Sequence, residues 1–154
     1  MIEEINIHIE EKFQDCLDEE WARRIVKYVL KAEGIVPSFE MSLVFTDSET
    51  VQGLNRDYRS VDESTDVLAF YMLSPKNNPP FVLPPDNVLH LGEVIISCPR
   101  AMEQAKEQEH LLEQELTLLI IHGTLHLLGY NHEQAEEESQ MRAREKELLV
   151  GISP

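Results

Sequence analysis

Residues 116–132, which read LTLLIIHGTLHLLGYNH, constrain the fold of this chain more than any other segment. His122 and His126 are four residues apart, and on a helix this spacing places both imidazoles on one face, about 6 Å apart along the axis. Gly129 follows the last apolar turn, where a glycine commonly ends a helix in a left-handed conformation. That reversal would bring His132 back to the same point. Three neutral nitrogens on a tetrahedral ion leave one position for water, which indicates a catalytic metal site.

The full H-x3-H-x2-G-x2-H pattern is much rarer than H-x3-H alone. It has the spacing of the long metzincin zinc motif, but Gly123 stands where those peptidases carry their general-base glutamate. The alternative is a set of ordinary histidines in a buried helix. Because the segment is apolar nearly all round, we expect it to be buried, and two imidazoles without partners would then cost on the order of 1 to 3 kcal/mol each. Metal coordination removes that cost, so the metal site is the favoured interpretation.

The overall composition is that of one globular domain, which we expect to span residues 1–154. Hydrophobic residues make up 42% of the chain and charged residues 27%, as in soluble proteins. The N-terminus is acidic and strand-like, unlike a signal peptide, and the longest apolar run is too short to cross a bilayer. We therefore expect a cytoplasmic protein without a membrane partner. Cys16 and Cys98 form no C-x-x-C pattern, so free thiols are expected.

The chain is strongly acidic, with 13 Lys and Arg against 29 Asp and Glu and a formal net charge of −16. Such a charge disfavours broad electrostatic attraction to nucleic acid. Any RNA substrate would have to be held by a local cationic patch, by a metal ion, or with the help of a partner protein.

The periodicity of apolar residues predicts four strands and about five helices. Strands are expected at 4–9, 39–46, 66–73 and 89–97, with Gly92 as a possible bulge. Helices are expected at 18–34 after Asp18, from the capping residues 46–49 to about Tyr58, at about 99–108, over the histidine segment and at 133–149. Residues 74–88 hold five of the eight prolines and should form a long loop. This loop is either a substrate-facing flap or a plain connector.

Three segments, IHGTLHLLGYNH, YRSVDESTDVLAF and LGEVIIS, together resemble the YbeY family of metal-dependent endoribonucleases, and the resemblance covers nearly the whole chain. The family pattern around the metal is close to H-G-x-L-H-L-x-G-Y-D-H. The residues that fit this pattern are His122, Gly123, Leu125, His126, Leu127, Gly129, Tyr130 and His132.

The resemblance implies an α+β fold with a small mixed four-stranded sheet and a zincin-like metal helix. It implies one zinc ion per chain, held by His122, His126 and His132. It further implies a role in ribosomal RNA maturation and ribosome quality control, with single-stranded or precursor ribosomal RNA as substrate. Ribosomal subunits or ribosome-associated proteins are the expected partners.

A second family segment is matched by LNRDYR at 54–59, whose terminal arginine, here Arg59, the resemblance implicates in activity. The following T-D-V-L of the family is matched by Thr65, Asp66, Val67 and Leu68. The chain also departs from the family pattern, with Asn131 in place of the usual Asp, Ser64 in place of Pro, Ala69 in place of Ser, and Glu93 where Asp is common. The Asn131 change removes a negative charge beside the last predicted ligand, where neighbouring groups tune metal affinity.

The expected catalytic residues are His122 and Arg59. A phosphodiester gathers negative charge in its transition state, and an arginine near the metal could contact the phosphate oxygens. The alternative for Arg59 is a surface arginine paired with Asp57 or Asp62, and Arg56 is a weaker candidate for the same role. Gly123 cannot act as general base.

The nucleophile and the general base stay open. Glu133 is one candidate base, and attack by the 2′-hydroxyl of the RNA itself is another route. The leading hypothesis is a zinc-dependent single-strand endoribonuclease. The second is a ribosome-associated RNA-processing factor with a structural zinc and little catalysis. A metallopeptidase is disfavoured by the missing glutamate.

Overall fold

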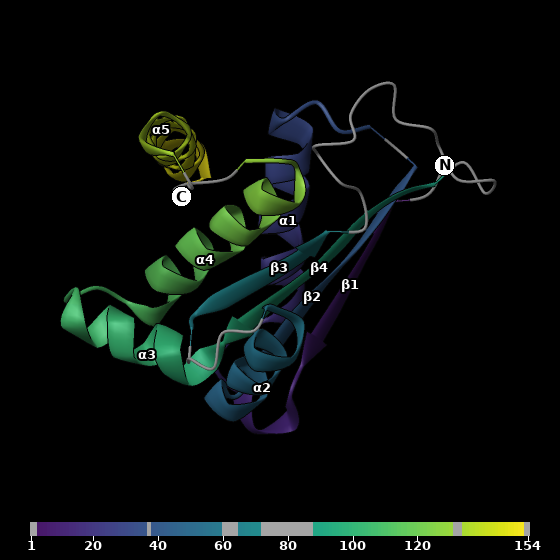
Figure 1. Cartoon of the computed structure of the whole chain (residues 1–154). Coiled ribbons are helices and arrows are strands. Elements are labelled where there is room, and N and C mark those ends of the chain that lie inside the picture. The colour runs from purple at the N-terminus through teal and green to yellow at the C-terminus, as the bar shows by residue number, and fades with distance from the viewer. Residues whose placement is uncertain (1–2, 37, 60–64, 72–87, 131–133, 153–154) are drawn as a thin grey trace.

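The structure is a computed structural model, and it describes residues 3–36, 38–59, 65–71, 88–130 and 134–152. Figure 1 shows the elements in chain order. They are β1 (Glu3–Ile9), the 3-10 turn η1 (Glu11–Phe13), α1 (Glu19–Ala32), β2 (Phe39–Thr46), α2 (Ser48–Arg59), β3 (Val67–Tyr71), β4 (Leu89–Ser97), α3 (Cys98–Glu107), α4 (Leu112–Leu127) and α5 (Ala135–Ile152).

The four strands form one sheet in the order β1-β2-β4-β3. β1, β2 and β4 are parallel, and β3 is antiparallel to β4, so the predicted mixed four-stranded sheet is confirmed. Glu40 pairs with His90 but Met41 pairs with Gly92, which leaves Leu91 as an extra residue. The φ of Gly92 is +127°, a value that favours glycine, and the predicted bulge is confirmed at this point.

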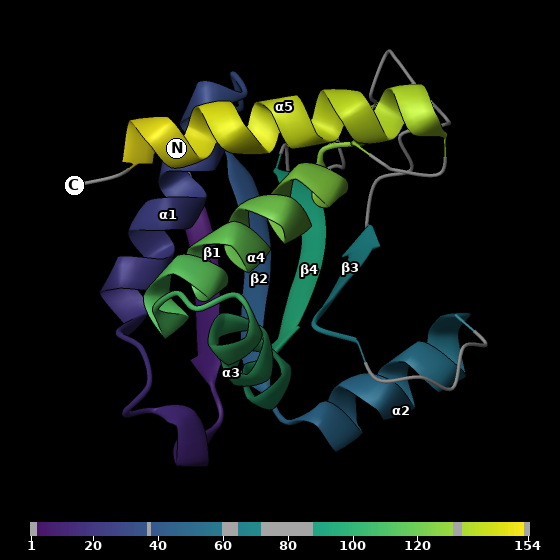
Figure 2. The same ribbon diagram turned by 90° about the vertical axis from the view of Figure 1, so that its left-hand side faces the viewer.

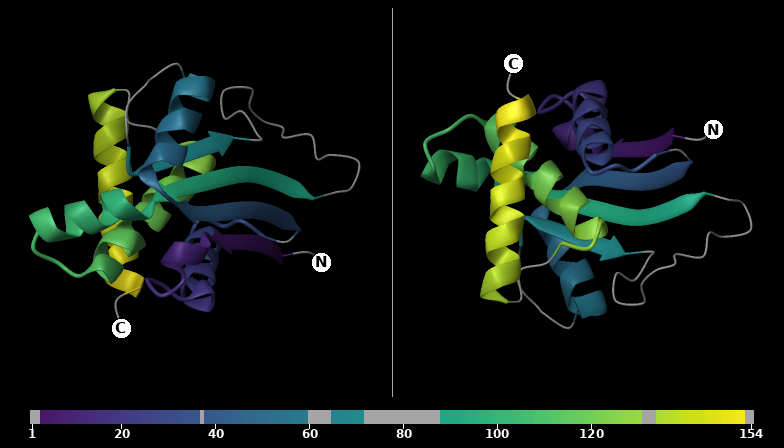
Figure 3. Two further views of the ribbon diagram at one scale, coloured as in Figure 1. Left: turned by 90° about the horizontal axis from the view of Figure 1, so that it is seen from below. Right: turned by 90° about the horizontal axis from the view of Figure 1, so that it is seen from above.

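The helices cover the two faces of the sheet unequally (Figure 1, Figure 3). α1, α3 and α4 pack on one face, where inward residues such as Leu43, Phe45 and Ile96 form the main core. α2 lies on the other face, where Val51 meets Leu68 and Ile95 in a smaller cluster. Figure 2 shows α5 lying across α1 and α4, and it is seated there by buried Met141 and Leu148.

The helix boundaries agree with the predictions to within a few residues. α1 begins after Asp18, whose carboxylate accepts a hydrogen bond from the backbone N–H of Trp21 at 3.0 Å. α4 begins before the apolar run, because Gln114 accepts a hydrogen bond from the backbone N–H of Leu111 and so caps an earlier, polar turn. The turn η1 was not predicted. The proline-rich segment 74–88 lies outside the described residues except for Val88.

No helix in the described ranges is both long enough and apolar enough to cross a membrane. The zincin-like character of α4 stays a prediction.

Candidate functional site

The last two turns of α4 bring His122 and His126 together. Their Nε2 atoms are 3.2 Å apart, and the ring planes make an angle of 72°. Two nitrogens that each lie about 2.0 Å from a tetrahedral ion are separated by about 3.3 Å. The spacing of four residues therefore places these two nitrogens at the separation that one shared metal ion requires.

The face of α4 that carries the two histidines is half-buried, so the prediction that this helix is buried on all sides is wrong on this face. Leu118, His122 and His126 are partly exposed, and the side chain of His122 is 27% exposed. The reason is that α5 crosses α4 at an angle and covers only part of it (Figure 2). The imidazoles of His122 and His126 are therefore accessible from solvent.

The end of α4 is formed by a left-handed glycine. Gly129 has φ +106°, and its N–H donates to the carbonyl of His126, while the N–H of Tyr130 donates to the carbonyl of Leu125, both at 3.1 Å. This pair of bonds is the Schellman motif, which reverses the chain direction. The predicted reversal is confirmed.

His132, the third predicted ligand, lies outside the described residues, and so do Asn131 and Glu133. Among the residues that the structure describes, no group of three metal-ligating side chains comes together. The three-histidine site therefore stays a prediction in which two members are found side by side.

Gly123 lies on the side of α4 that faces the sheet, away from the two histidines. A Cβ built at this position would lie 2.5 Å from Cγ1 of Val94 and 3.2 Å from Cγ2 of Val67. α4 can approach β3 and β4 this closely only because residue 123 has no side chain. In this chain, the position that carries the metzincin glutamate is used for helix-to-sheet packing.

Glu145 of α5 is the site residue that sequence reasoning missed. The Nδ1–H of His122 donates a hydrogen bond to Oε1 of Glu145, whose side chain is 13% exposed. The sequence does contain a signal for this residue. Glu145 comes four residues after Met141 and three before Leu148, a spacing that places it on the same inward side of the last helix as these apolar residues. A carboxylate in such a stripe requires a partner, and the partner is His122.

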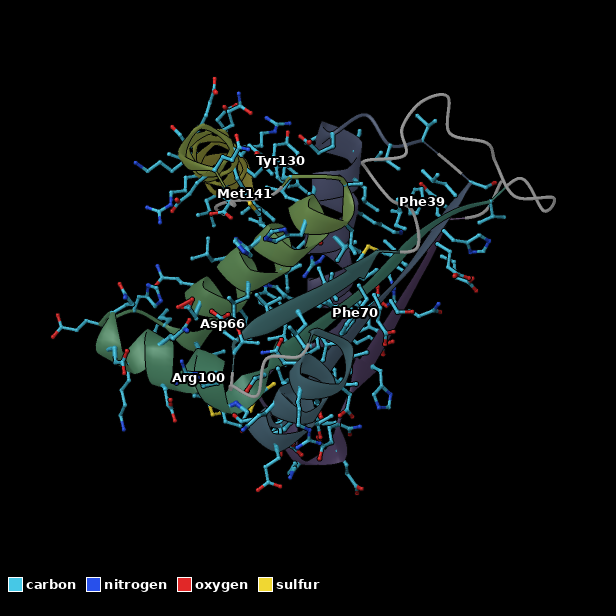
Figure 4. All side chains as sticks on the ribbon, in the orientation of Figure 1. Phe39, Asp66, Phe70, Arg100, Tyr130 and Met141 are labelled. Atoms are coloured by element: carbon cyan, nitrogen blue, oxygen red, sulfur yellow. The ribbon has the colours of Figure 1, made fainter. Side chains whose placement is uncertain are left out.

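An ion pair made by Arg144, the residue next to Glu145, holds α5 in place. Arg144 donates to Oε2 of Glu33 at 2.6 Å and to the carbonyl of Ala32 at 3.0 Å, at the end of α1. Burial raises the pKa of Tyr130, and a hydrogen bond with Glu33 raises it further. Tyr130 packs against the same core as Met141 (Figure 4). The end of α1, the end of α4 and the middle of α5 are thus joined around the carboxylate of Glu33, whose side chain is 12% exposed.

A groove of about 490 Å³ runs between α4 and α5 beside His122. Its charged lining consists of Glu138 and Glu145 with Arg142 and Lys146, and Arg142 pairs with Glu138 at 2.6 Å. The cations and carboxylates balance in number. This groove is therefore not the cationic patch that the acidic composition called for.

Arg59 is the last residue of α2, whose middle packs on the far face of the sheet from α4, and the Arg59 side chain lies outside the described part of the chain. Its predicted contact with phosphate stays a prediction. Arg56, the weaker candidate, pairs with Asp57 at 3.3 Å on the exposed surface. Asp66 stands at the entrance of β3 (Figure 4), where its carbonyl accepts from the N–H of Ser97.

The remaining described histidines lie apart from this pair. His90 contacts Glu40 across two strands at 3.1 Å, and His110 contacts Glu115 at 3.4 Å. His8 is exposed on β1. None of them contributes to this site.

Comparison with known proteins gives a consistent result. A family model described as "Endoribonuclease YbeY" matches residues 4–153. A protein of that name from Dehalococcoides mccartyi (strain CBDB1) is 43% identical over 147 residues, covering 92% of this chain and 89% of that protein. Another, from Roseiflexus castenholzii, is 38% identical over 152 residues, covering 97% and 94%.

A solved structure has the same fold. The solution structure of TM1509 from Thermotoga maritima superposes with a TM-score of 0.62 at 25% identity, covering 94% of this chain and 86% of that protein.

Proposed function

The chain belongs to the YbeY family of endoribonucleases, and we propose that it is a zinc-dependent endoribonuclease that cleaves single-stranded ribosomal RNA precursors in the cytoplasm. The relatives named above are endoribonucleases by name, which supports the reaction class. The single observation that carries the metal dependence is the 3.2 Å separation of the Nε2 atoms of His122 and His126. Ribosome maturation and quality control are the proposed cellular roles.

The residues present fit a zinc ion on chemical grounds. With its Nδ1–H donated to Glu145, His122 keeps the lone pair of Nε2 for a metal. His126 presents its Nε2 at the matching separation, and His132 is proposed as the third ligand. Neutral imidazoles are the ligands that catalytic zinc sites commonly use, with one position left open.

Each residue then has a defined task in phosphodiester cleavage. A zinc ion, when bound, would polarise a phosphoryl oxygen and could lower the pKa of a bound water. His122 and His126 would hold it on a rigid helix, and Arg59 is proposed to contact the phosphate oxygens, where negative charge develops. The nucleophile is either water, with Glu133 as candidate base, or the 2′-hydroxyl of the RNA.

The acidic composition means that the metal ion and Arg59 would also have to attract the RNA. With a net charge of −16, the protein as a whole repels RNA. The charges of the groove beside His122 balance, so it adds no net attraction. The metal ion and Arg59 would therefore supply the local attraction for phosphate, and we expect RNA binding to weaken when either is removed.

The experiment compares wild type with His126→Ala, using zinc analysis of protein purified without chelator and cleavage of single-stranded RNA. Wild type should carry about one zinc per chain and cleave, and His126→Ala should lose both. His8→Ala is the matched control, because His8 is exposed on β1 and should be silent. Cleavage that survives in His126→Ala would contradict the proposal.

Arg59→Glu separates substrate contact from metal binding. This variant should lose RNA cleavage and keep its zinc, whereas Arg24→Glu, a charge reversal on the exposed face of α1, should keep both. Loss of zinc in Arg59→Glu would instead assign Arg59 a structural role.

The second candidate is a ribosome-associated RNA-processing factor whose zinc is structural. The net charge of −16 favours it, since an acidic protein that does not grip RNA by itself could act through a partner protein. It predicts about one zinc per chain without cleavage of isolated RNA, and binding to ribosomal particles that survives in Arg59→Glu.

A further inference from the structure

We propose that Glu145 is a positioning residue that fixes the tautomer and ring orientation of His122, so that Nε2 of His122 is presented toward His126. This inference rests on the proposed function, because its purpose is metal binding. It concerns a residue of the last helix, distant in sequence from the histidine motif. The contact that carries it is the hydrogen bond from Nδ1–H of His122 to Oε1 of Glu145.

The chemistry of imidazole makes such a contact decisive. A neutral imidazole carries one hydrogen, and only the other nitrogen keeps the lone pair that binds a metal. A carboxylate facing Nδ1 stabilises the hydrogen on that nitrogen, so the lone pair of His122 is on Nε2. This is the atom that lies 3.2 Å from Nε2 of His126.

Glu145 is itself held rigidly. It lies between Met141 and Leu148, which are 1% and 2% exposed and seat α5 on the core. The preceding residue, Arg144, is fixed to the end of α1 through Glu33. The carboxylate is therefore held beside α4, and because its side chain is only 13% exposed, the hydrogen bond from His122 offsets much of the cost of its burial.

Packing against α5 also orients the ring. The rings of His122 and His126 are nearly perpendicular, with centroids 4.7 Å apart. Four residues along one helix bring the two side chains near each other, but they do not fix the rotation of either ring. The bond to Glu145 fixes that rotation for His122. Groups of this kind, which orient a ligand without touching the metal, commonly change metal affinity 10- to 100-fold.

The first test reads the tautomer in the metal-free protein, independently of zinc. Long-range ¹⁵N–¹H correlation spectra at pH about 8.5, well above the ordinary histidine pKa, report which ring nitrogen carries the hydrogen. We expect the Nδ1–H form for His122 in wild type and loss of this preference in Glu145→Ala. An Nε2–H tautomer of His122 in wild type would overturn the proposal.

The second test measures zinc affinity by competition with a chromophoric chelator. Glu145→Ala should bind zinc about 10- to 100-fold more weakly. Glu145→Gln keeps an oxygen that accepts from Nδ1–H and should recover part of the loss. Glu136→Gln is the matched control: Glu136 is exposed and lies nine residues earlier, about half a turn away around α5, so its affinity should equal that of wild type.

The outcomes separate the two proposals. If wild type binds zinc and Glu145→Ala binds it equally well, the role of Glu145 is refuted while the proposed function stands. If wild type binds no zinc, both proposals fail. Urea unfolding of metal-free Glu145→Ala and Glu145→Gln distinguishes positioning from packing, because recovery of affinity in Glu145→Gln without a matching recovery of stability supports positioning. Recovery of both in parallel refutes it.

Discussion

Replacing Gly123 by alanine should destabilise the protein, although the same change usually stabilises a helix. Glycine in a helix interior is about 1 kcal/mol less favourable than alanine. At this position, however, the new Cβ would lie 2.5 Å from one methyl of Val94 and 3.3 Å from the other, and 3.2 Å from a methyl of Val67. Carbon atoms pack at about 3.5–4.0 Å, so α4 or the sheet has to move by up to about 1 Å.

The balance can be estimated from these contacts. Val94 is fully buried on a central strand and cannot turn away, so the cost should lie in the upper part of the 1–3 kcal/mol typical of overpacked cores. After the gain in helix propensity, we expect a net destabilisation of about 1–2 kcal/mol. For a urea m-value of about 2 kcal/mol/M, the unfolding midpoint should fall by roughly 0.5–1 M.

Gly53→Ala is the matched control. Gly53 also lies inside a helix, α2, but its Cβ would meet only Nη2 of Arg56, at an ordinary 3.8 Å. This variant should be stabilised by about 0.5–1 kcal/mol. If urea unfolding shows Gly123→Ala to be stabilised as much as Gly53→Ala, the close approach of α4 to the sheet is refuted.

Two further predictions concern groups whose pKa is shifted by the fold. Burial raises the pKa of Cys98 to about 12. At pH 8 a thiol reagent should therefore modify the partly exposed Cys16 and leave Cys98 unmodified until the protein is unfolded. Rapid modification of both thiols would contradict this burial. The pKa of Asp47 is lowered, chiefly by the hydrogen bond from the backbone N–H of Thr50. The contribution of Asp47 to the stability of the fold is therefore complete above the ordinary pKa near 4, and it is lost as the pH falls through the lowered pKa. Asp47→Ala should therefore cost about 1 kcal/mol at pH 7, with the difference from wild type shrinking at acidic pH, and a constant difference across pH would refute the cap.

Local sequence rules were sufficient for most of the fold. Asp18 and Asp47 cap helices where capping residues were expected, Gly92 lies at the predicted bulge, and Gly129 has the predicted left-handed φ. These features depend on a few consecutive residues, so they can be recognised without knowledge of the fold. The same holds for the pairing of His122 with His126, which follows from the helical repeat.

What could not be predicted depends on contacts between distant segments. Glu145 reaches His122 because α5 crosses α4, and no local pattern fixes that crossing. The packing role of Gly123 against Val94 depends in the same way on the distance between a helix and the sheet. The half-buried state of the histidine face also depends on how much of α4 the last helix covers. Such contacts join residues far apart in the chain, and they appear only when the elements are assembled.

Zinc X-ray absorption on the zinc-loaded protein reads the ligands of the proposed metal site. We expect three imidazole ligands and one oxygen donor at about 2.0 Å in wild type, and one imidazole fewer in His132→Ala. A shell with sulfur ligands, a closed shell of four protein ligands, or an unchanged spectrum in His132→Ala would contradict an open site built on His122, His126 and His132.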